Sequence, residues 1–344
     1  MKVKQFGALL IALLSQTFIG CEDSMENYDW LASESAPKGY PMEIINGTFL
    51  YPGQENGLYI PNHKLIYDGW GEPISTHVVG PDVKPLPDRL EITFYSFTED
   101  QFYHGTFDLP YNLIRQRFAE GYESNIKDQG ILDFRKLVVG VAPGGHVAVW
   151  IRGAGKSEEV FFGQANPIEY DWELFWKQSF GDNHAQPRDE FRLRMMEGSD
   201  AHKAIEQAQS DTVPFDKWAR LRKHYPWEPR FFRMAVPEKR IGIDYVNGEL
   251  YFLEPPFNAE DSTDTRPMPK HLAFHSNSAL FLIHFDEDEM LEAFEALADG
   301  DKRLYLDIAP YIPRTKTEIR LRNEDGNIRK LEKFYVEELR KYDS

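Results

Sequence analysis

The chain has 344 residues and a formal net charge of −17 at pH 7. A charge this negative argues against nucleic acid or anionic lipid as the main partner, because both would repel the protein. It is compatible with a cationic partner, although solubility alone also explains it. The single cysteine excludes a disulfide within the chain.

Residues 1–21 have the features of an export signal. Lys2 and Lys4 give a positive start, residues 7–14 form a short apolar run, and Phe18-Ile19-Gly20-Cys21 closes the segment. The run is too short for an ordinary membrane span, and its order is typical of a secretory signal peptide. The last four residues resemble a lipobox, which predicts lipidation of Cys21. A plain signal peptide with an incidental cysteine is the alternative.

Lipidation would attach the mature chain to a membrane without a spanning helix. Bacterial lipoproteins of this kind carry three acyl chains, and two or more hold a protein stably. We therefore expect a membrane-anchored lipoprotein of the bacterial cell envelope, on the periplasmic face or the cell surface. Residues 22–36 are polar and acidic, and we interpret them as a tether. Acidic residues directly after the cysteine resemble the surface-export signal of Bacteroidetes lipoproteins.

The first folded domain is expected over residues 37–180. It contains a long connection rich in glycine and proline, from Tyr67 to Pro87, in which Trp70 stands between two glycines. Long loops often carry function, and exposed Trp and Arg are common contact residues. Trp70, His77 and Arg89 are therefore the candidate binding surface. The alternative is that Trp70 closes the open end of its own sheet.

Residues 187–224 are rich in Arg, Glu, Lys and Ala, and they predict a helical connector. Phe215, Trp218 and Leu221 lie at helical spacing, which favours a buried stripe on one of the sheets over a cofactor site.

Residues 227–344 are expected to form a second domain that is a degenerate repeat of the first. Asn46-Gly47 and Asn247-Gly248 each stand between β-prone residues, a strong hairpin signal. Further matches follow in the same order: 87–90 with 269–272, a helix from Asp108 to Gly121 with one from Asp286 to Gly300, 136–143 with 303–310, and strands at 147–152 and 318–322. Chance similarity among short β-rich pieces is the alternative. The fold class is α+β, with two related antiparallel-sheet domains, each packed by one helix and joined by the connector.

No catalytic, metal or nucleotide motif is recognisable. Gly153-Ala154-Gly155-Lys156-Ser157 is not a phosphate-binding loop, because Trp150 stands where that loop requires glycine, and we interpret it as a hairpin turn. The ten histidines show no zinc-protease spacing, and no Gly-x-Ser-x-Gly elbow occurs. The acidic run 286–289 sits at a predicted helix start, where it complements the helix dipole. We therefore expect no cofactor and no metal.

Four segments carry a resemblance to a known family. They are residues 35–43, Gly69-Trp70-Gly71, residues 85–90 and residues 102–110. They resemble bacterial lipoproteins grouped as domain of unknown function 2931, over about residues 30–165. The resemblance implies a bacterial envelope context and no established activity, and it offers no catalytic residues.

The leading hypothesis is a non-enzymatic, lipid-anchored module that binds a protein or a glycan in the envelope. One alternative is an immunity lipoprotein that inhibits a secreted toxin. The other is an enzyme that acts on an envelope polymer, which would require converging carboxylates or histidines in a cleft.

Overall fold

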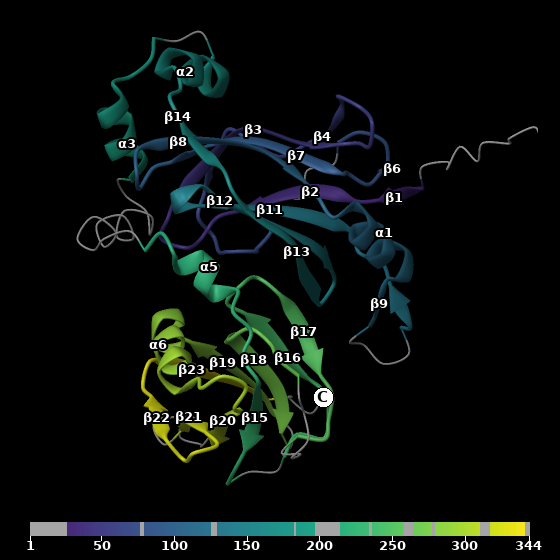
Figure 1. The fold of residues 1–344 in the computed structure, drawn as a ribbon, viewed down its shortest axis with the longest axis vertical. Coiled ribbons are helices and arrows are strands. Elements are labelled where there is room, and N and C mark those ends of the chain that lie inside the picture. Colours follow the sequence, from purple (N-terminus) through teal and green to yellow (C-terminus); the bar gives the residue numbers. More distant parts are fainter. Residues whose placement is uncertain are drawn as a thin grey trace, which may run out of the picture.

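The computed structural model describes residues 26–75, 79–124, 129–181, 184–196, 214–233, 236–257, 264–276, 279–309 and 317–340. Strands dominate this part of the chain and helices are few (Figure 1). The prediction of sheets with a small number of helices is confirmed. No helix among these residues is both long and apolar enough to cross a membrane.

The first half of the molecule is defined here as the elements that precede α2. They are β1 (Asn27–Asp29), β2 (Leu31–Ser35), β3 (Met42–Leu50), β4 (Gly57–Tyr59), β5 (Leu65–Ile66), β6 (Val83–Pro85), β7 (Arg89–Ser96), β8 (Gln101–Asp108), α1 (Tyr111–Glu120), β9 (Tyr122–Glu123), β10 (Ile131–Leu132), β11 (Lys136–Ala142), β12 (His146–Gly153), β13 (Lys156–Gln164) and β14 (Asn166–Ile168).

Three helices follow in the described part of the chain, and then the second half. The helices are α2 (Trp172–Phe180), α3 (Arg188–Met196) and α5 (Lys217–Leu221). The second half comprises β15 (Trp227–Phe231), β16 (Ile241–Tyr245), β17 (Leu250–Leu253), β18 (Pro269–Ser276), β19 (Ala279–Phe285), α6 (Glu287–Leu297), β20 (Leu304–Ala309), β21 (Glu318–Asn323), β22 (Ile328–Leu331) and β23 (Phe334–Arg340). Figure 1 shows α5 between the two halves, whereas α2 and α3 lie at the far end of the first half.

Three large sheets hold most strands. One has the order β2-β11-β12-β13-β17-β16-β18-β19-β23 and therefore runs through both halves. The others have the orders β14-β8-β7-β3-β4, with β5 beside β3, and β15-β20-β21-β22. β2 is parallel to β11, and β15 is parallel to β20. The sheets are mainly antiparallel, as predicted, but two of them are mixed. β2 and β15 each precede the helix of their half and lie beside a strand that follows it, and that crossover returns the chain in the same direction.

The strands of the two halves pair in the same way. β3 is antiparallel to β4 and β7, as β16 is to β17 and β18. β8 lies between β7 and β14, as β19 lies between β18 and β23. The strands that follow each helix pair with one strand that precedes it. The order β2-β11-β12-β13 of the first half corresponds to β15-β20-β21-β22 of the second. The same succession of elements thus occurs twice along the chain.

Burial patterns follow from which faces of a strand are covered. β19 alternates between buried and half-buried side chains, so one face meets the core. β11 is buried along nearly its whole length, because Leu137 and Val139 belong to the first-half core whereas Val138 belongs to the core of the second half. A third cluster lies where α2 and α3 cover Tyr95 and Phe97 of the six-stranded sheet and its edge.

The predicted tether is wrong from residue 27 onward. Those residues form β1 and β2, and Trp30 is fully buried, with its Nε1 donating to Pro85 O at 3.1 Å. The acidic composition concealed this, since Glu34 is itself buried and forms an ion pair with Lys64. Residues 1–25, with the predicted signal and the lipidation site, lie outside the described part of the chain.

The two Asn-Gly pairs have different structures. Asn247-Gly248 forms the turn between β16 and β17, with Gly248 at φ +87° and its N–H donating to Tyr245 O at 3.0 Å. Asn46-Gly47 instead lies inside β3, next to an irregularity in the pairing with β7. Residues 153–157 form the predicted hairpin turn between β12 and β13.

The helix boundaries were predicted in part. Asp286 caps α6 by accepting from Glu289 N, but that helix ends at Leu297, before Gly300. α1 ends at Gly121 (φ +66°) as expected, but it starts at Tyr111 rather than at Asp108. The connector contains α3 and α5, and residues 197–213 lie outside the described ranges.

Candidate functional site

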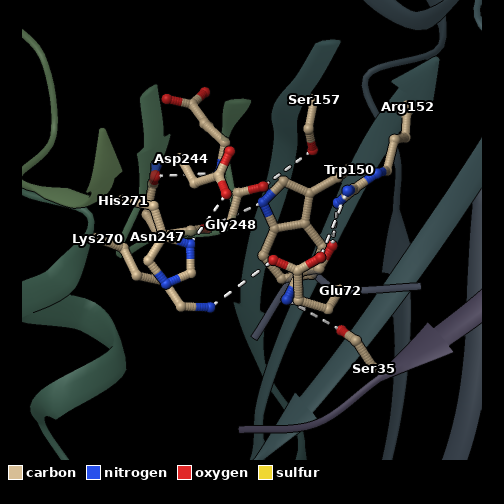
Figure 2. Close-up of polar contacts among 12 residues, drawn as sticks. Ser35, Glu72, Trp150, Arg152, Ser157, Asp244, Asn247, Gly248, Lys270 and His271 are labelled. Atoms are coloured by element: carbon tan, nitrogen blue, oxygen red, sulfur yellow. Dashed lines mark hydrogen bonds and ion pairs between the residues drawn. The ribbon is translucent and has the colours of Figure 1, made fainter. Parts of the chain in front are cut away.

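The two halves meet through close backbone contacts between two glycine turns. A Cβ placed on Gly71 would lie 2.6 Å from Gly248 Cα, so no larger residue fits without movement. Trp150 Nε1 donates to Asn247 O at 3.0 Å, and Ser157 Oγ donates to Gly248 O at 2.9 Å (Figure 2). The turn predicted as a simple hairpin therefore also joins the halves.

Trp70 lies in this junction and is only 5% exposed. Its ring meets Trp150 edge to face, with centroids 5.0 Å apart and an interplanar angle of 89°. A Cβ on Gly140 would come within 2.9 Å of both indoles. Gly140 in β11 thus leaves the space in which the two rings pack. Trp70 belongs to the same apolar cluster as the second-half core, so it closes the contact between halves rather than the end of its own sheet.

The indole nitrogen of Trp70 is buried and has no hydrogen-bond partner in the described part of the chain. The ring atom nearest to Gly140 is Cζ3. A buried donor without a partner costs about 1–3 kcal/mol, so a group that accepts from it would stabilise the site.

Glu72 joins charged groups of the two halves. Its carboxylate lies 3.4 Å from Arg152 and 3.7 Å from Lys270, and Arg152 also donates to Gly71 O at 2.9 Å. Figure 2 shows the two cations reaching Glu72 from different sides. This arrangement fixes the loop that carries Trp70 against both sheets.

A cavity of about 260 Å³ opens beside Trp70, between the halves and α5. Its aromatic and aliphatic lining comprises Tyr40, Trp70, Trp218, Leu221, Val246 and Phe285. Its polar lining includes Lys38, Asp68, Lys217, Lys270, His271 and Glu287. An apolar cavity with a few converging polar groups is the usual form of a small-molecule site.

Lys217 attaches α5 to the start of α6. Its Nζ lies 2.8 Å from Glu287 and 2.7 Å from Asp288. Burial lowers the pKa of Lys217, but the two carboxylates outweigh burial and raise that pKa. Lys217 is therefore a charged structural group of the cavity wall.

His271 brings a titratable group to the cavity. Its Nδ1 lies 3.0 Å from an Asp244 oxygen, and its ring centroid lies 4.6 Å from that of His284 on the neighbouring strand. Burial, followed by the charge of His271, lowers the pKa of His284. In the described ranges, no group of three or more His, Cys, Asp and Glu residues is arranged to hold a metal ion.

The structure separates the residues of the predicted binding surface. Trp70 lines the cavity but is buried, so its assignment as an exposed contact residue is wrong. Arg89 does not line the cavity. Its guanidinium group lies elsewhere and donates to Gln54 O at 2.7 Å. His77 and Cys21 lie outside the described residues. The sequence did not indicate Lys38, Lys270 or His271, which come from distant segments.

A second polar chain lies under α2. Ser179 Oγ donates to Glu43 Oε1 at 3.0 Å, and His63 Nδ1 lies 3.1 Å from Ser179 Oγ. Burial raises the pKa of Glu43 to about 7, although the bond from Ser179 lowers it in part. When Glu43 is ionised, it accepts from Ser179, and the serine in turn accepts from His63 Nδ1–H. A nucleophile and its base require the opposite arrangement, in which the histidine accepts from the serine.

These features define a class: a β-rich protein whose two similarly connected halves enclose a ligand-sized cavity. A family model described as Protein of unknown function (DUF2931) matches residues 17–216, more than half of the chain, and the chain belongs to this family. No curated protein and no solved structure matches it significantly.

Proposed function

We propose that the protein is a lipid-anchored bacterial envelope protein that binds a glycan in the cavity between its halves. The anchor rests on the lipobox-like segment that ends at Cys21. The binding role rests on one observation above all: an aromatic cavity into which Lys38 and Lys270 bring polar groups, lined by Trp70, whose buried N–H has no partner in the described residues. A ligand hydroxyl or carbonyl would satisfy this donor.

The proposal includes an architecture of two related domains, with the second a degenerate repeat of the first. Identical strand pairing in the two halves supports it, as does the crossover that makes β2 and β15 parallel to their neighbours. The parallel pairs carry most weight here, because parallel pairing requires a long connection of similar kind each time. The cavity then lies at the interface of the domains, a common place for ligand sites.

The lining favours a sugar ring over a purely apolar group. Half-buried Tyr40 offers aromatic surface for the C–H face of a pyranose, and it meets Trp218 edge to face with centroids 5.3 Å apart. Trp218 and Trp70 are buried and form the wall behind it. Lys38 and Lys270 supply donors for hydroxyl, carbonyl or carboxylate oxygens. The volume is near the lower end of the roughly 300–1,000 Å³ of drug-sized pockets, which suits one sugar unit of a chain.

Calorimetric titration with the disaccharide of N-acetylglucosamine and N-acetylmuramic acid tests the binding role. We expect binding to the mature protein, and Trp70→Phe should weaken it about three- to tenfold through loss of one hydrogen bond. Trp176→Phe is a matched control, because Trp176 on α2 is equally buried and its Nε1 also has no partner in the described ranges. The proposal fails if the disaccharide and related envelope saccharides do not bind, or if both variants weaken binding equally.

A further inference from the structure

The four-stranded sheet of the second half turns a basic face away from the core. Strand pairing places Ala309 and Glu318 at one end of this face. The eight side chains beside them form what we call the arginine face. They are Glu228 and Arg230 of β15, Tyr305 and Asp307 of β20, Arg320 and Arg322 of β21, and Ile328 and Lys330 of β22. Leu304, Leu306 and Ile308 alternate with these residues on β20 and belong to the core.

Aromatic rings hold the guanidinium groups in place. Arg322 lies 4.3 Å and Arg230 4.9 Å from the ring centroid of Tyr305, while Arg320 lies 5.0 Å from that of Phe232. Stacking on a ring restricts the orientation of each planar guanidinium group. The face is therefore pre-ordered, which lowers the entropic cost of binding.

Positive charge exceeds negative charge on this face, although the whole chain is acidic. Asp307 forms ion pairs with Arg320, at 2.9 Å, and with Arg322, at 3.3 Å. Glu228 forms an ion pair with Arg230 at 2.5 Å. At the end of the face, Glu318 pairs with Arg233 at 3.0 Å. With this pair and Lys330 on β22, five cations meet three carboxylates. A basic surface on a chain with a net charge of −17 attracts an acidic group locally.

The equivalent face of the first half has a different composition and is buried against the second half. Pairing registers place Val138 opposite Trp150 and Gly140 opposite Ala148, where β20 and β21 have Tyr305 opposite Arg322 and Asp307 opposite Arg320. Val138, Ala148 and Trp150 are fully buried in the cluster that contains the second-half core.

The face of the second half is instead open to solvent. Arg320 is 41% and Arg322 31% exposed in their side chains, and Ile328 is 53% exposed. One repeat thus buries this face against its neighbour, whereas the other presents arginines and a tyrosine.

We propose that the arginine face binds an acidic segment of a partner protein. An arginine guanidinium group can donate two parallel hydrogen bonds to one carboxylate. Arg and Tyr are also enriched among the residues that contribute most binding energy at protein interfaces. Ile328 adds apolar area at the edge strand β22, which a protein chain can cover. An anionic membrane is a poorer fit, because the remainder of the protein is strongly acidic and would be repelled.

Fluorescence anisotropy with a labelled peptide of alternating Glu and Tyr tests this surface. The mature protein should bind the peptide at low salt, and salt should weaken the binding. The triple variant Arg320→Gln, Arg322→Gln, Asp307→Asn removes two cations without leaving a buried carboxylate unpaired. It should lower the affinity at least tenfold and leave saccharide binding in the cavity unchanged.

The control is Arg115→Gln with Lys239→Gln, two exposed cations outside the face. Lys330→Glu, on the exposed edge strand, is a second variant should the triple variant fail to fold, and it should also weaken binding. The proposal is overturned if the peptide does not bind, if the control loses as much affinity as the face variants, or if vesicles rich in phosphatidylglycerol bind while the peptide does not.

Discussion

Gly140→Ala would test whether the packing of Trp70 on Trp150 holds the halves together. The added Cβ would lie 2.6 Å from Trp150 Cζ3 and 2.9 Å from Trp70 Cζ3. Ordinary contact begins near 3.4 Å, so one ring or the strand must move by about half an ångström or more. Such overpacking costs about 1–3 kcal/mol, and disturbing the edge-to-face pair adds about 0.5–1.5 kcal/mol.

Alanine also restricts the unfolded chain more than glycine does, which raises the free energy of unfolding by about 0.4–1 kcal/mol. The net expectation is a loss of about 2 kcal/mol in the free energy of unfolding, measured by urea denaturation, with a changed near-ultraviolet circular dichroism of the tryptophans. Gly242→Ala is the control, because its Cβ would meet one atom of Phe252 at 3.1 Å and the others at 3.6 Å or more. Equal stability of the two variants, with an unchanged tryptophan spectrum, would refute the assigned packing.

Three further outcomes are expected. Glu43 is 2% exposed, and burial raises its pKa from the ordinary 4.5 to about 7. The folded state therefore binds more protons between these pH values, and the free energy of unfolding falls as pH rises through that window. Glu43→Gln should remove about 3 kcal/mol of this fall, measured as the difference between variant and parent in denaturation at pH 4.5 and 7.5; parallel pH profiles would contradict it. Lys217→Met leaves Glu287 and Asp288 without their partner and should cost about 2 kcal/mol, whereas Lys223→Met, an exposed control, should change stability by less than about 0.5 kcal/mol. Cys21→Ser should move the protein from the membrane fraction to the soluble fraction and abolish incorporation of labelled palmitate; unchanged membrane association would refute the anchor.

Local signals in the sequence predicted local structure well. Asn247-Gly248 gave a hairpin turn because a residue with positive φ is needed there, and Asp286 capped a helix because its carboxylate reaches Glu289 N. The tether prediction failed because the burial of this segment comes from distant parts of the chain. Trp30 contacts Phe49 and Pro85, and residues 31–35 pair with β11, more than 100 positions away. Parallel pairing of this kind has no local signature.

The cavity was missed for the same reason. Lys38, Lys217 and Lys270 converge only after both halves have folded and α5 has packed between them. Trp70 was predicted as an exposed contact residue because it stands between two glycines, but Gly71 serves close approach to Gly248 and Trp70 is buried. The sequence alone cannot distinguish a glycine that makes a loop flexible from one that allows another backbone segment to approach closely.

The most direct test is a nuclear magnetic resonance spectrum of the indole N–H groups in protein labelled with ¹⁵N-tryptophan. Addition of the N-acetylglucosamine–N-acetylmuramic acid disaccharide should shift the Trp70 resonance, assigned from Trp70→Phe, and leave that of Trp176 in place. If the disaccharide binds while the Trp70 resonance stays unchanged, the cavity beside Trp70 is not the binding site.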